Sequence, residues 1–140
     1  MTRLIATIII GLTLLCGGHA DTKGTIVNYQ CVRCGTLLRL DHTPASQGCR
    51  AGGQHRWQEL GALGRDYYSC RRCNTLVEVS AEPTDQGCPA KGRHEWNRLG
   101  HMGDTHYRCD RCLLEVNCNR TPSPTGCAQG GRHVWQRTDN

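Results

Sequence analysis

The stretch YSCRRCNTL, residues 68–76, holds two cysteines separated by two residues, Cys70 and Cys73. Two cysteines at this spacing form a redox-active dithiol, a disulfide or half of a metal site. The residues that accompany the pair decide among these readings. They also decide the fold, because a chain of 140 residues with 11 Cys, 17 Gly and no Phe has too little apolar material for one large core.

The pair recurs three times at a spacing of 39 residues, without insertion or deletion. Each copy reads Y-x-C-x-R-C, then a proline, then G-C, then G-x-H-x-W. A fixed period of this length predicts tandem modules of one kind. The repeated cysteines, histidines and tryptophans are Cys31, Cys70 and Cys109; Cys34, Cys73 and Cys112; Cys49, Cys88 and Cys127; His55, His94 and His133; and Trp57, Trp96 and Trp135.

Local patterns within a copy predict short strands joined by loops. The apolar runs 36–40 (TLLRL) and 75–79 (TLVEV) have strand length and composition. Segments 55–60 and 94–99 are less apolar, and the glycine-rich segments 61–64 and 100–103 are expected to interrupt the chain after them. No helical periodicity of useful length follows residue 20.

A unit of about 39 residues is too small to be stable on a hydrophobic core alone, so its Cys and His residues are expected to cross-link it. Disulfides are the first expectation for an exported, cysteine-rich chain. Three cysteines per copy would leave one unpaired in every unit, which is unfavourable for a disulfide framework built by repetition.

Adding the histidine gives four donors per copy in the order C-x2-C-x14-C-x5-H. Structural zinc sites use four tetrahedral N/S ligands, and a C-x-x-C turn places two thiolates on one ion. At these residues the copies resemble zinc ribbons and related zinc-knuckle folds. The resemblance implies small, β-rich, metal-stapled modules, here three zinc-ribbon-like repeats in an extended array with one zinc ion each. Disulfides with free thiols, and iron or another metal, are the alternatives.

Enzymatic readings of the cysteines have less support. A thioredoxin-like dithiol needs a helix N-terminus in a βαβ unit, and the copies have no such pattern. A catalytic zinc needs an open coordination position, whereas each copy offers four protein donors. Glu95 has the counterparts Arg56 and Val134, so the repeat supplies no consistent general base. We therefore expect structural sites and no enzymatic activity.

Other repeated residues have structural and functional readings. The tryptophans are expected to pack over the metal sites, with an aromatic binding platform as the alternative. Prolines 44, 83 and 122 would stiffen the long loop, and glycines 48, 87 and 126 would permit a tight turn before the third ligand. Arg33, Arg72 and Arg111 would offset the charge of three thiolates on zinc, or would form an arginine row that contacts a partner.

The third copy departs from the others at Cys118, which replaces Leu40 and Val79. We expect a buried thiol there, with an intermolecular disulfide or a substitute ligand as alternatives. Histidines 42, 101 and 106 lack counterparts in the other copies and are not counted as ligands.

The first twenty residues have the pattern of a secretory signal. A basic start at Arg3 precedes an apolar run over residues 4–15, and small residues end at Ala20, the expected cleavage point. The run is short for a membrane span, so the mature chain should have no transmembrane segment. A lipoprotein acylated at Cys16 is the alternative.

These patterns predict a secreted or periplasmic protein divided into a signal peptide (1–20) and zinc repeats at 21–60, 61–99 and 100–140. We expect it to bind a protein or a cell-envelope component. Alternatives are a metal-buffering protein, a disulfide-containing secreted binding protein and, without export, a nucleic-acid-binding zinc-ribbon protein. The net charge of +5 falls to about +4 without Arg3 and to about +1 with three zinc sites near −1 each, which disfavours nucleic acid.

Overall fold

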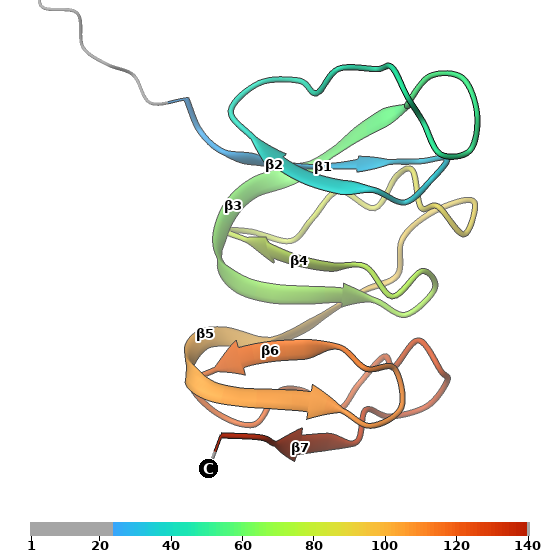
Figure 1. Cartoon of the computed structure of the whole chain (residues 1–140). Helices are drawn as coiled ribbons and strands as arrows, with labels where there is room; N and C mark the ends of the chain where they lie inside the picture. The colour runs from blue at the N-terminus through green and yellow to red at the C-terminus, as the bar shows by residue number, and fades with distance from the viewer. Residues whose placement is uncertain (1–23, 140) are drawn as a thin grey trace, which may run out of the picture.

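A computed structural model describes residues 24–139 of the chain. The expected signal peptide and Cys16 lie outside the described residues. Within residues 24–139 no helix is long and apolar enough to span a membrane. The strands are β1 (Val27–Cys31), β2 (Leu37–Leu40), β3 (Trp57–Cys70), β4 (Leu76–Val79), β5 (Trp96–Cys109), β6 (Glu115–Cys118) and β7 (Trp135–Arg137) (Figure 1).

Three antiparallel units follow one another along the chain and are stacked in Figure 1. The first unit consists of β1, β2 and the start of β3. The second consists of the end of β3, β4 and the start of β5, and the third of the end of β5, β6 and β7. The 14-residue strands β3 and β5 therefore each belong to two units.

Strands β2 and β4 form where the apolar runs 36–40 and 75–79 predict them. In β4, Val77 and Val79 are fully buried, whereas Leu76 and Glu78 are half-buried on the opposite face. This alternation is the two-residue period of a strand that lies between two layers.

The prediction that the glycine-rich segments 61–64 and 100–103 interrupt the chain is wrong. β3 and β5 continue through these segments and bend at bulges; in β3, Leu63 and Asp66 both pair with Val79. A Cβ atom on Gly64 would lie 2.1 Å from the backbone nitrogen of Ser80, so only glycine allows this close approach. Glycine here bends the strand from one unit into the next.

Apolar cores fill the junctions between units. At the first junction, Leu60 of the first unit packs with Val77 and Val79 of the second. At the second junction, Leu99 of the second unit packs with Val116 and the buried Cys118 thiol of the third. Each unit therefore covers the core of its neighbour, as in other repeat proteins.

Buried polar side chains add hydrogen bonds across the junctions. The Gln30 side-chain amide donates to Thr75 Oγ1 (2.6 Å), and the Asn28 amide donates to the Glu78 carbonyl oxygen (2.9 Å). At the second junction the Asn74 amide donates to the Cys112 carbonyl oxygen (3.0 Å). These bonds fix one unit relative to the next, because each side-chain amide must meet one particular acceptor in the neighbouring unit.

Candidate metal centres

The structure brings the four donors of each copy together. In each cluster the thiol sulfurs and one histidine nitrogen all lie within 4.8 Å of one another. The clusters are Cys31, Cys34, Cys49 and His55; Cys70, Cys73, Cys88 and His94; and Cys109, Cys112, Cys127 and His133. Each is a potential metal-binding site.

A tight turn positions the first two cysteines of every cluster. In the first unit the Gly35 N–H donates to the Cys31 carbonyl oxygen (2.9 Å), and this bond reverses the chain between Cys31 and Cys34. The same bond recurs in the other units. The residue after the second cysteine adopts a positive φ of 77° at Gly35, 60° at Asn74 and 64° at Leu113. Leucine is strained in this region, and Leu113 is also 59% exposed.

A second tight turn carries the third cysteine. In the second unit the Cys88 N–H donates to the Gly92 carbonyl oxygen (3.1 Å), and the Lys91 N–H donates back to the Cys88 carbonyl oxygen (2.9 Å). The preceding glycine has a positive φ in all three units, as its sequence position predicts: 78° at Gly48, 76° at Gly87 and 82° at Gly126.

The arginine within each C-x-R-C turn reaches across to the loop between the third cysteine and the histidine. Arg111 donates to the carbonyl oxygens of Gln129 (3.2 Å), Gly130 and Arg132 (3.0 Å). Arg33 likewise bonds three loop carbonyls, whereas Arg72 bonds one, that of Arg93 (2.7 Å). Each guanidinium thus joins the two halves of its own cluster.

Each cluster histidine turns Nδ1 towards the thiols. The distance from Nδ1 to Sγ of the second cysteine is 3.5 Å for His55, 3.6 Å for His94 and 3.4 Å for His133. The Nε2 atoms of His94 and His133 are buried and have no hydrogen-bond partner in the described residues. Nδ1 is therefore the atom available as a ligand, and Nε2 would carry the proton of the neutral ring.

The tryptophans stack on these histidines, as predicted for residues that pack over the sites. Ring centroids are 4.5 Å apart for His55 and Trp57, 4.4 Å for His94 and Trp96, and 4.7 Å for His133 and Trp135. Each indole N–H also donates to a carbonyl oxygen of the preceding loop, at 2.9–3.0 Å. The indole therefore fixes the ring orientation and ties down the loop at the same time.

The thiols of a cluster differ in acidity. The hydrogen bond from Cys73 lowers the pKa of Cys70 to about 3 despite burial, and the same contact together with burial raises the pKa of Cys73. Burial opposes ionisation of Cys34, but hydrogen bonds from Thr36, Cys31 and Cys49 together outweigh it and lower the pKa to about 5. Burial raises the pKa of Cys112 to about 12. Each cluster thus contains at least one thiol with a lowered pKa and at least one with a raised pKa.

The donor set fits a metal ion. Three adjacent thiols cannot all ionise without a compensating charge, whereas a coordinated divalent cation deprotonates each of them. All ten cysteines in the described residues are free, and nine of them belong to the clusters. The clusters differ in access, because Cys34 and His55 of the first are half-buried while all four residues of the third are buried.

Sequence reasoning missed one contributor to the clusters. The hydroxyl of Thr36 lies 3.1 Å from Cys34 Sγ, and that of Thr75 lies 3.0 Å from Cys73 Sγ. The sequence did contain a pattern that indicates this contact, because both threonines stand two residues after the second cysteine. The third copy has Leu114 there, so its second thiol lacks this bond.

The remaining candidates lie outside the clusters. Cys118 is fully buried in the second junction, as expected, and burial raises its pKa. His42 pairs with Asp41 (2.6 Å), and His101 pairs with Asp66 (2.9 Å). His106 contacts Thr138. None of these residues is a member of a cluster.

Comparisons with protein-family models, with curated proteins and with solved structures found no match to the chain.

Proposed function

We propose that this chain is an exported, non-enzymatic protein with three structural zinc sites, and that its stacked units bind a protein or a cell-envelope component. The observation that carries the proposal is the convergence of three thiols and one imidazole in every unit. Cys₃His is an established ligand set for structural zinc. Bound zinc would supply the cross-link that so small a unit lacks.

The closed donor set supports a structural role. Four protein donors fill a tetrahedral shell, whereas catalytic zinc keeps one position for water or substrate. The histidine is held by its tryptophan, and the arginine ties the turn to the loop. Both contacts serve to hold the four donors in place. We therefore assign Cys31, Cys34, Cys49 and His55, with their equivalents in the other units, to metal binding and none of them to catalysis.

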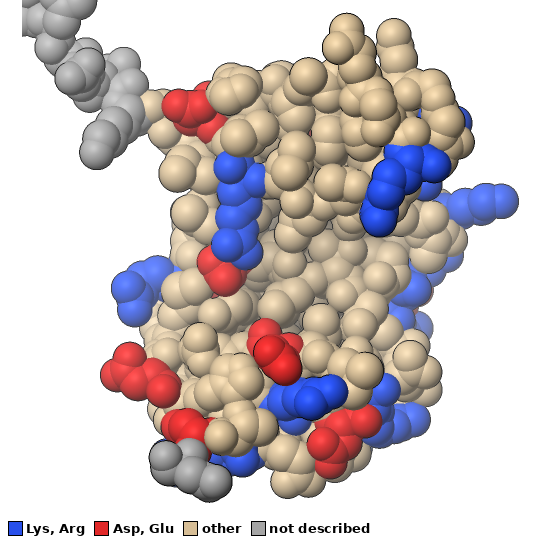
Figure 2. All heavy atoms as spheres, viewed as in Figure 1, with Lys and Arg blue, Asp and Glu red and all other residues tan. Residues whose placement is uncertain are grey.

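The face shown in Figure 2 supports a partner other than nucleic acid. On the face shown in Figure 2, basic and acidic side chains are interspersed. Several arginines are paired with carboxylates, as Arg93 is with Asp85 (2.9 Å) and Arg98 with Asp66 (2.8 Å). A nucleic-acid site would instead need arginines and lysines gathered on one face.

Metal buffering is a second candidate, and the half-buried Cys34 and His55 of the first cluster favour it. An accessible ligand exchanges more readily than a buried one. Buffering predicts a chain that stays folded after losing metal, whereas structural zinc predicts unfolding.

The test is isolation of the protein from the exported fraction, followed by intact mass and elemental analysis. We expect cleavage after Ala20 and three zinc ions per chain. A metal-free mass lowered by several disulfides would contradict the zinc assignment, and an uncleaved chain in the cytoplasmic fraction would contradict export. Folded protein after full zinc removal would favour buffering.

A further inference from the structure

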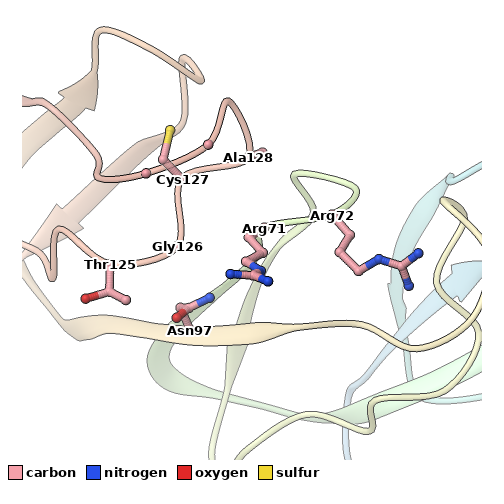
Figure 3. A pocket seen from close by; sticks show the side chains of 9 residues that line it. Arg71, Arg72, Asn97, Thr125, Gly126, Cys127 and Ala128 are labelled. Carbon is pink, nitrogen blue, oxygen red and sulfur yellow. The ribbon is translucent and has the colours of Figure 1, made fainter.

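The two junctions differ on the side that carries the metal-binding turns. At the second junction a hollow of about 300 Å³ separates the second unit from the third. Its walls are formed by Arg71, Arg72 and Asn97 on one side and by the loop 125–131 on the other (Figure 3).

The first junction is filled at the equivalent place. Val32 stands where the second junction has Arg71, and Pro89 stands where it has Ala128. An added Cβ atom on Gly87 would lie 2.9 Å from Val32 and 3.0 Å from Gln58. At the second junction Asn97, the counterpart of Gln58, lies 2.1 Å from the same point on Gly126, but Arg71, the counterpart of Val32, is not among the nearest atoms. The Pro89 ring lies 3.7 Å from the position that a Cβ atom on Gly35 would occupy. The hollow therefore arises from substitutions between copies and not from the repeat itself.

The Arg71 guanidinium is the group in this hollow best suited to a ligand. Its Nε donates to the Glu95 carboxylate, while Nη1 and Nη2 have no acceptor within residues 24–139. The side chain is 59% exposed. Arg72 differs, because its Nη1 donates to Arg93 and its guanidinium is turned away from the Cys127 loop in Figure 3.

The charged side chains beside the hollow are Arg71, Arg72 and Glu95. Glu95 is shared by the two guanidiniums, since it binds Arg71 and lies 3.9 Å from Arg72 Nε. These three side chains carry a net charge of about +1, and the third cluster, whose Cys127 lines the hollow, would add about −1 with zinc bound, so an anion would be held by the Nη1 and Nη2 atoms of Arg71 and not by a general positive charge. Asn97 stands beside Arg71 as a neutral polar group, whereas the Thr125 hydroxyl is turned away from Arg71 (Figure 3). Gly130 leaves the facing loop open, since a Cβ atom there would meet nothing within 4 Å.

We propose that this hollow binds a carboxylate group of a peptide partner, with the Nη1 and Nη2 atoms of Arg71 as the principal donors. The end of a guanidinium matches a carboxylate through two parallel hydrogen bonds. The carboxylate could come from an aspartate or glutamate side chain or from a chain terminus. This inference rests on the proposed role as a binding array and adds the chemistry of the partner.

The test is an NMR titration of the full chain, with its metal content measured beforehand. The probes are acetyl-Gly-Glu-Gly-amide for a side-chain carboxylate, acetyl-Gly-Gly-Gly with a free carboxyl terminus, the neutral acetyl-Gly-Gln-Gly-amide, and inorganic phosphate. We expect at least one carboxylate peptide to shift the signals of Arg71, Asn97 and residues 125–131, and the neutral peptide to shift none of them. The more effective peptide identifies the source of the carboxylate.

Two variants transplant the residues of the filled junction. R71V removes the guanidinium and A128P fills the facing wall; each should weaken peptide binding about tenfold or more. R120V, at an exposed arginine elsewhere, should leave binding unchanged. Full affinity in R71V with three metal ions bound would overturn the carboxylate site, as would stronger shifts with phosphate, yet both would leave the zinc assignment intact. Specific peptide binding by a metal-free chain would contradict the zinc assignment alone.

Discussion

The interior of a unit and the junction between two units are built from different side chains. In the third unit the buried interior consists of Cys109, Cys112 and Cys127, with few apolar neighbours. The first junction, by contrast, is made of Leu60, Val77 and Val79, all fully buried. The interior therefore depends on what the thiols bind, whereas the junction depends on apolar area removed from water.

The residues at the junction positions also differ among the three units, whereas the clustered donors are the same in each. Leu37 and Leu76 face the next unit, and the third unit carries the exposed Glu115 at the equivalent position. The first unit keeps Leu38, 37% exposed, where the second has the buried Val77. Junction residues thus differ from one unit to the next, while the clustered cysteines and histidines do not.

The largest effect should come from removing one ligand of the middle cluster. Cys88→Ser should reduce the metal content from three ions to two and unfold the second unit, with a loss of about 5 kcal/mol or more, because a structural zinc site contributes about 10–16 kcal/mol to folding. Native mass spectrometry gives the count, and hydrogen exchange locates the unfolding. Cys118→Ser is the matched control at a buried thiol outside the clusters and should retain all three ions. A Cys88→Ser protein that still binds three ions would contradict the ligand assignment.

Shortening a junction leucine should cost stability without loss of metal. We expect Leu60→Ala and Leu99→Ala each to lower the free energy of unfolding by about 2–4 kcal/mol, because each leaves a cavity that the packed neighbouring side chains fill only in part. Urea unfolding measures the change, and Leu38→Ala, at an exposed position, should change it by less than about 0.5 kcal/mol. Metal loss in the leucine variants would show that the apolar junctions and the metal clusters do not contribute to stability independently.

Adding a methyl group at the bend of β3 should be more costly than adding one at a merely strained glycine. The new Cβ of Gly64→Ala would meet the backbone of Ser80, which cannot move without breaking the pairing of β3 with β4. Gly52→Ala meets nothing within 4 Å and pays only for its φ of 89°, about 1–2 kcal/mol. Thermal unfolding should rank Gly64→Ala as the less stable variant. Equal stability would mean that the bend does not require glycine.

The smallest effects should appear at the arginines. Arg111→Met removes hydrogen bonds to three loop carbonyls, whereas Arg72→Met removes the one to Arg93. We expect both variants to bind three ions and to release metal to a chelator several-fold faster than the unchanged chain, with the larger effect at Arg111. Unchanged release rates in both variants would argue against these arginines as ties within the cluster.

Much of the site follows from the repeat alone. A period without a slip identified all twelve clustered residues, because a donor set of fixed size must recur with its unit. The strands at 36–40 and 75–79 follow from apolar runs. The course of β3 could not be predicted, since Gly64 has the same local signature whether a strand ends there or bends. The decisive fact is the approach of Ser80, a contact made by the following strand.

The arginine within the turn was equally ambiguous in the sequence. Charge compensation, contact with a partner and a tie to a loop all require the same side chain. Only the fold places the carbonyls of Gln129 and Arg132 within reach of Arg111. The hollow beside Arg71 could not be predicted from the sequence either, because it depends on which residues of two adjacent copies face each other.

Native mass spectrometry of the protein with and without a strong chelator, combined with circular dichroism, shows whether zinc holds the three units folded. We expect three zinc ions per chain, no mass deficit from disulfides, and loss of the β-sheet signal when the ions are removed. A metal-free chain that carries several disulfides and keeps its sheet signal in chelator would contradict this expectation.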